Sequence, residues 1–250
     1  MPIVTIHYLT ITIVTRMEIN TYLIGLAFVV ILAYIIIVSS RTILESLIQL
    51  TIEKHKSEIS KQKGSIYVAK QINRDYLLYF KKFKKIKYCF IDSFAIAGVY
   101  KDNSFSYYQL RSYFCLGHTF SVIFLDTEKK YEKNFSNIEI KPQKSISLGK
   151  DHDLEWNQFN RYFINKFDNP RQALEVVSPT FMQQLVRIKE KYQNIYVEYF
   201  ESSEYQKNCL VIYKKGALFP MFFYKKGKFD KYYNNFLEFL SDCIELNKSI

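Results

Sequence analysis

The chain has 250 residues and a net charge of +11, and the excess positive charge lies after residue 40. Its 21 Tyr and 21 Phe residues are enough for a large core, while only 7 Gly and 5 Pro residues exclude a disordered or repetitive chain. Four widely separated cysteines exclude the disulfide framework of small secreted domains, so we expect reduced thiols, as in the cytosol.

Residues 1–18 form a short N-terminal segment that is apolar and rich in Thr and Ile. It is too short to cross a bilayer. A second methionine, Met17, leaves open whether translation starts at Met1 or at Met17.

Residues 19–40 contain no Asp, Glu, Lys, Arg, His or Pro. As a helix this segment would be about 33 Å long, which matches a hydrocarbon core of roughly 30 Å. Its apolar residues lie on every side of the helix rather than along one stripe. The pattern therefore predicts a single transmembrane helix. A buried core helix is one alternative, and a cleaved signal peptide ending near Ser39 is another.

Basic residues near the ends of this segment predict its orientation. Arg16 stands alone before it, whereas Arg41, Lys54, Lys56 and Lys61 follow it. Because cytoplasmic flanks are richer in Lys and Arg, we expect a single-pass protein of the cell membrane with its head in the cytoplasm. Residues 41–63 predict a juxtamembrane helix that ends at Gly64.

Residues 64–250 predict one head domain of mixed structure. A helix is expected at 73–85, and Ser178 with Pro179 forms a typical helix start before a helix at 180–192. The C-terminal segment, 229–246, predicts an amphipathic helix. The other expected elements are strands at 86–91, 95–100, 119–125, 137–141, 196–200, 209–214 and 217–224, with short helical segments at 156–163 and 170–175. Runs of strands with helices between them predict an α+β fold.

Catalytic signatures are missing from the sequence. It has no Gly-rich phosphate loop, no His-Glu-x-x-His and no Gly-x-Ser-x-Gly, so no catalytic residue, metal ligand or cofactor is assigned and an enzyme stays open. Cys115 and His118 have a zinc-like spacing without a second pair, and a buried core thiol explains Cys115 better. Asp151, His152 and Asp153 fit a solvated turn better than an acid–base cluster.

Basic and aromatic residues alternate between residues 80 and 88. This pattern serves anionic lipid headgroups or single-stranded RNA, and an ordinary amphipathic helix end is the simpler alternative. Because the run follows the expected anchor, we favour lipid headgroups over nucleic acid as the partner. The candidate membrane-surface residues are Lys81, Lys82, Lys84, Lys85 and Lys87.

Residues 154–185 carry a resemblance to a known family. The matching pieces are Leu154-Glu155 with Phe159 and Phe163, Asp168 with Gln172-Ala173, and Ser178-Pro179-Thr180-Phe181-Met182 with Leu185. In these pieces the chain resembles an uncharacterised bacterial membrane-associated family, domain of unknown function 3137, over roughly residues 75–246. Leu174 stands where that family tends to have Arg, the front half matches loosely, and family members often have two spans. The resemblance implies a membrane-tethered α+β domain and assigns no reaction.

These patterns together predict a membrane-anchored binding protein whose basic head lies near an anionic lipid surface and binds an unknown protein partner. A membrane-anchored enzyme of the hydrolase kind, whose polar residues converge only in the folded chain, is the alternative.

Overall fold

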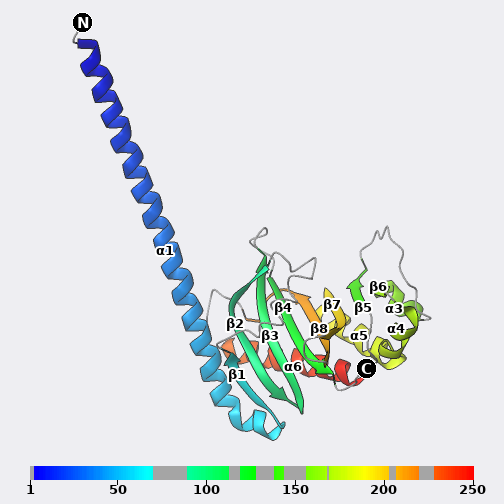
Figure 1. Cartoon of the computed structure of the whole chain (residues 1–250). Helices are drawn as coiled ribbons and strands as arrows, with labels where there is room; N and C mark the ends of the chain where they lie inside the picture. Colours follow the sequence, from blue (N-terminus) through cyan, green and yellow to red (C-terminus); the bar gives the residue numbers. More distant parts are fainter. Residues whose placement is uncertain are drawn as a thin grey trace. The chain divides into compact units, whose positions relative to one another are not determined.

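The computed structural model describes residues 3–69, 89–112, 119–127, 138–143, 156–167, 169–202, 207–219 and 228–250. It divides into two compact units, residues 1–44 and residues 45–250. Figure 1 shows the helices and strands along the chain. The helix expected at 73–85 lies outside the described residues.

The N-terminal segment, the expected span and the expected juxtamembrane helix form one helix, α1 (Ile3–Lys61). None of the helices in the described part of the chain qualifies as a membrane span, so the predicted transmembrane helix at residues 19–40 is wrong. The apolar segment is the middle of α1, not a separate helix.

The described strands form one eight-stranded antiparallel sheet in the order β1-β2-β3-β4-β8-β7-β5-β6. The α+β class of the folded unit is therefore confirmed. The strands are β1 (Ser65–Ala69), β2 (Cys89–Tyr100), β3 (Asn103–Ser112), β4 (Thr119–Thr127), β5 (Ile138–Pro142), β6 (Phe163–Phe167), β7 (Ile195–Ser202) and β8 (Lys207–Lys215). The helices after α1 are α3 (Asn157–Tyr162), α4 (Pro170–Val176), α5 (Pro179–Tyr192) and α6 (Phe229–Lys248).

The first face of the sheet is covered by α6, which lies behind the sheet in Figure 1. Phe236 of α6 packs against Phe105 and Tyr107 of β3, with ring centroids 6.1 and 5.1 Å apart. Tyr192 of α5 packs against Phe239 of α6, so α5 lies beside α6. Alternate residues of each strand face these helices, which explains why large aromatic side chains recur at every second position.

The second face of the sheet carries a separate buried cluster. Its members come from β2, β3, β4, β7 and β8, and they are Ala95, Tyr108, Leu110, Phe120, Val122, Phe124, Phe200, Cys209, Val211 and Tyr213. Most of these strands are thus buried on both faces, which explains why their sequences do not alternate simply between apolar and polar residues.

Two strand expectations differ from the structure. The described part of the strand expected at 86–91, residues 89–91, and the strand expected at 95–100 belong to one strand, β2, with a break in the register between Ile91 and Ala95. The strand expected at 217–224 is wrong for its described part, residues 217–219, which lie in an irregular segment. Hydrogen bonds to side chains fix this segment: Leu218 N–H donates to Ser121 Oγ (3.1 Å) and Phe219 N–H donates to Gln109 Oε1 (3.2 Å). Because side chains satisfy these backbone groups, the segment does not need a strand partner.

Candidate functional site

The sequence-based candidates lie mainly outside the described residues. Lys81, Lys82, Lys84, Lys85 and Lys87, proposed as membrane-surface contacts, fall in the gap between residues 69 and 89. The Cys115–His118 pair and the Asp151–Asp153 turn also lie outside the described residues. These assignments therefore stay predictions.

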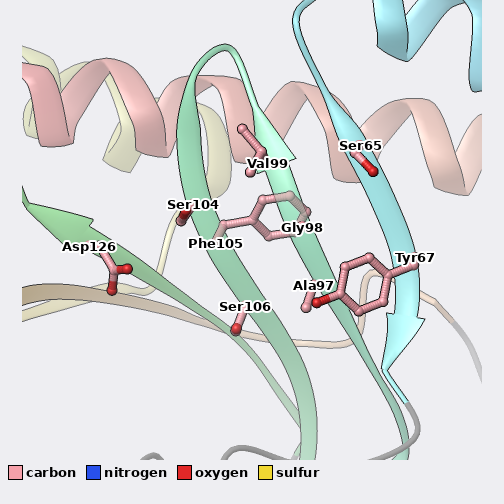
Figure 2. Close-up of a pocket in the computed structure, with 9 residues that line it drawn as sticks. All are labelled: Ser65, Tyr67, Ala97, Gly98, Val99, Ser104, Phe105, Ser106 and Asp126. Carbon is pink, nitrogen blue, oxygen red and sulfur yellow. The ribbon is translucent and has the colours of Figure 1, made fainter. Parts of the chain in front are cut away.

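The structure instead places a recess on the second face of the sheet, across β1, β2, β3 and β4 (Figure 2). Its volume is about 300 Å³. Small side chains create it, because Ala97 of β2 and Ser104 and Ser106 of β3 leave space above the backbone. The full lining is Ser65, Tyr67, Ala97, Gly98, Val99, Ser104, Phe105, Ser106 and Asp126.

Gly98 is what allows β1 to approach β2 at this recess. It has a positive φ of 152°, and a Cβ atom at this position would lie 1.9 Å from the carbonyl oxygen of Ser65. Any side chain would therefore push β1 away, so only glycine is compatible with this wall of the recess.

The chemistry of the recess is that of hydrogen bonding. Three serine hydroxyls and the Tyr67 phenol line it, and the Asp126 carboxylate lies on the β4 side, as Figure 2 shows. Burial, together with the nearby Asp126, raises the pKa of the Cys209 thiol well above its usual range. This thiol therefore stays protonated and is not a nucleophile. The recess can hold a small polar group that forms hydrogen bonds with these side chains.

A polar cluster lies on the same face, at β5, β7 and β8. Tyr213 donates a hydrogen bond to Glu198 Oε1 (2.9 Å) and its ring stacks on Tyr196 with centroids 4.9 Å apart. Burial and the adjacent Glu198 carboxylate raise the pKa of Tyr213, so this phenol remains a donor. Glu139 lies opposite Glu198 in the β5–β7 register and forms an ion pair with Lys141. We interpret this cluster as structural, because each group already has a partner.

Metal binding has no support in the described part of the chain. There, no group of three or more His, Cys, Asp or Glu side chains could hold an ion. The two cysteines whose side chains are described, Cys209 and Cys243, are both free and buried.

The other prominent feature belongs to the first unit. Between Tyr22 and Ile36, large apolar side chains of α1 are exposed by 47% to 80% of their surface. They are Tyr22, Leu23, Ile24, Leu26, Phe28, Val29, Val30, Ile31, Leu32, Tyr34, Ile35 and Ile36, and we call this set the apolar stretch. Such a continuous exposed apolar surface is unusual and marks an interaction site.

Sequence reasoning found the apolar stretch but missed the recess. The alternation of Ala95, Ala97 and Val99 in β2 with Ser104 and Ser106 in β3 was the available signal. It indicates a sheet face with small side chains, but only when the β2–β3 register is known.

Comparison with protein-family models, with curated proteins and with solved structures finds no match to this chain. The resemblance to domain of unknown function 3137 accordingly stays a prediction that rests on residues 154–185.

Proposed function

We propose that this chain is a lipid-attached binding protein, in which the apolar stretch of α1 holds the chain at a membrane and the folded unit of residues 45–250 binds a partner. The observation that carries the proposal is the exposure of twelve large apolar side chains along consecutive turns of one helix. Burying twelve such side chains would yield on the order of 20 kcal/mol.

The distribution of these side chains favours lipid as the environment that covers them. Adjacent residues such as Leu23 and Ile24, or Val29 and Val30, point to different sides of a helix, and all are more than half exposed. A partner protein that contacts one face would leave the others in water. A lipid surface is not restricted to one fixed face of the helix.

Charge supports an anionic membrane surface. The net charge of +11 comes from residues after the apolar stretch, including the run from Lys81 to Lys87. Each basic residue near an anionic surface contributes about 1 kcal/mol of attraction. We place the folded unit on the cytoplasmic side, since the described thiols of Cys209 and Cys243 are free and such thiols persist in reducing compartments.

Flotation of the full chain with liposomes tests the proposal. We expect the protein to float with both neutral and anionic vesicles, and the Ile24→Asp/Phe28→Asp/Ile31→Asp variant to stay at the bottom of the gradient. Its matched control places three aspartates on exposed positions of the folded unit, as Leu174→Asp/Gln183→Asp/Asn235→Asp, and should float as the parent does.

A second variant tests the charge contribution. Replacing Lys81, Lys82, Lys84, Lys85 and Lys87 by Gln should weaken flotation with anionic vesicles at low salt and leave neutral vesicles unaffected. If the parent protein stays at the bottom with every vesicle, or the Ile24/Phe28/Ile31 variant floats with neutral vesicles, lipid attachment through the apolar stretch is wrong.

A further inference from the structure

The first strand, β1, is an edge of the sheet. It pairs with β2 on one side, and no strand among the described residues pairs with its other side. Its sequence, Ser-Ile-Tyr-Val-Ala, carries neither charge nor proline. The opposite edge strand, β6, differs because it carries the exposed Lys166. Charges and prolines usually protect edge strands from pairing, and the sequence of β1 has neither.

A groove of about 790 Å³ lies beside this edge, between β1 and the part of α1 that belongs to the folded unit. Ile66 faces the α6 side of the sheet and Tyr67 the opposite side, yet both line the groove. The groove therefore follows the edge of the strand. Its lining is Gln49, Ile52, Glu53, Lys54, Lys56, Ser57, Ile59, Ser60, Gly64, Ser65, Ile66 and Tyr67.

The connection between α1 and β1 fixes one end of the groove. Gly64 N–H donates to Ile59 O (3.0 Å), and a Cβ atom at Gly64 would lie 2.8 Å from Ile59 Cγ2. The residue that precedes β1 is thus packed tightly against the last turn of the helix. One ion pair holds the helix to α6, with Lys54 Nζ 2.6 Å from Asp230 Oδ2, and His55 Nε2 lies 3.5 Å from Asp230 Oδ1. The groove is therefore built into the folded unit.

We propose that the edge of β1 binds an extended peptide segment of a partner protein as an additional strand of the sheet. Alternate residues of β1 direct their N–H and C=O groups away from β2, and an extended backbone is the ligand that satisfies such a row. This inference concerns the folded unit and does not depend on lipid attachment.

Side chains of the groove specify the kind of peptide. Ile52, Ile59 and Ile66 are buried and form an apolar floor, so every second side chain of the peptide is apolar. Lys56 at the rim has a side chain that is 77% exposed and lies 3.9 Å from Glu53, a long ion pair. An acidic peptide residue is the complement to this lysine. A second copy of β1 lacks any acidic residue, which favours a different chain as the occupant.

Selection from a random peptide library on the full chain in detergent micelles tests the proposal. We expect enriched peptides with alternating apolar residues and at least one Asp or Glu. The Ser57→Trp variant fills the groove and should lower their affinity at least tenfold, whereas Lys61→Trp, on the same helix but outside the groove lining, should bind as the parent does.

Backbone methylation provides the sharper readout. An edge strand bonds with only one set of alternate peptide N–H groups, so N-methylation of that set should abolish binding of an enriched peptide while methylation of the other set changes affinity less than threefold. The Lys56→Glu variant should weaken acidic peptides severalfold and lose the salt dependence of their binding.

Several outcomes would overturn this inference. They are a library that yields no enriched peptide, peptides that bind Ser57→Trp as tightly as the parent, and equal sensitivity to methylation of either set. Concentration-dependent dimers that Ser57→Trp abolishes would assign the edge to a second copy instead. Flotation with liposomes depends on the apolar stretch and not on the edge of β1. A negative result in the peptide-binding experiments therefore leaves the proposed lipid attachment intact.

Discussion

Ser178 joins two distant segments of the folded unit. Its hydroxyl accepts a hydrogen bond from Phe181 N–H (3.1 Å) at the start of α5 and donates one to the carbonyl oxygen of Ser249 (3.0 Å) near the C-terminus. The Ser178→Ala substitution should lower the free energy of unfolding by about 1–2 kcal/mol, because it removes the helix cap and leaves that N–H group without its partner. Urea unfolding followed by circular dichroism measures the loss.

The control for this prediction is Thr180→Ala. Thr180 is exposed in the first turn of α5, and its substitution should shift the unfolding midpoint little. An unchanged midpoint for Ser178→Ala would mean that this hydroxyl does not cap α5.

Residue-level sequence signals succeeded where the interaction is local. Ser178 followed by Pro179 predicted a helix start, and this prediction is confirmed. Gln109 could not be found in this way. It is fully buried and accepts hydrogen bonds from Tyr107 OH and from Phe219 N–H, a residue 110 positions away. Nothing local in the sequence marks such a residue.

An ion pair joins α1 and α6, and its contribution to stability depends on pH. The hydrogen bond from Lys54 holds the pKa of Asp230 below its usual value, and a weaker contact with His55 acts in the same direction. A carboxylate whose pKa is lower in the folded state stabilises the folded protein at pH values above its unfolded pKa of about 3.9. This contribution is lost as the pH falls through the pKa of the folded state. Because the Asp230 side chain is 45% exposed, solvent limits the contribution to less than about 1 kcal/mol.

The Asp230→Asn substitution should therefore lower stability at pH 5 to 7 by a few tenths of a kcal/mol and leave it nearly unchanged below about pH 3. Urea titrations at pH 7, 5, 4 and 3 give the comparison. Glu190→Gln, an exposed carboxylate on α5, is the control and should show no such convergence with the parent. A difference that grows toward low pH would contradict this assignment.

Elements were predicted well where one chain segment determines them. The α5 and α6 helices and the β7–β8 pair lie close to their expected positions, because helical periodicity and β-branched runs are local patterns. β1, β3 and β6 were missed. β3 has the sequence Asn-Ser-Phe-Ser-Tyr-Tyr-Gln-Leu-Arg-Ser, whose strand propensity is mixed, and pairing with β2 and β4 on both sides determines its structure.

At the scale of the whole chain, the apolar stretch and the sheet belong to separate compact units, residues 1–44 and residues 45–250. The expected transmembrane helix is wrong, because no described helix qualifies as a membrane span, and residues 19–40 lie within the longer helix α1. Apolar composition did identify the part of α1 whose described side chains are exposed.

This division predicts that solubility and folding respond to different substitutions. The Ile24→Asp/Phe28→Asp/Ile31→Asp variant should keep the full chain monodisperse without detergent, whereas the parent should associate through its exposed apolar side chains. The same variant should unfold in urea at the parent's midpoint. The fluorescence of Trp156 reports the unfolding of the folded unit alone, because Trp156 is the single tryptophan of the chain and lies in that unit. Its ring centroid is 6.3 Å from that of Phe159.

Tryptophan fluorescence during urea unfolding in detergent gives the unfolding curves of the parent and of the triple aspartate variant under matched conditions. Substitutions in independent parts of a protein change stability within about 0.5 kcal/mol of additivity, so a larger shift at Trp156 would mean that the apolar stretch is part of the cooperative unit. An unchanged midpoint combined with a gain in solubility is the result expected if the apolar stretch contacts lipid and the sheet folds without it.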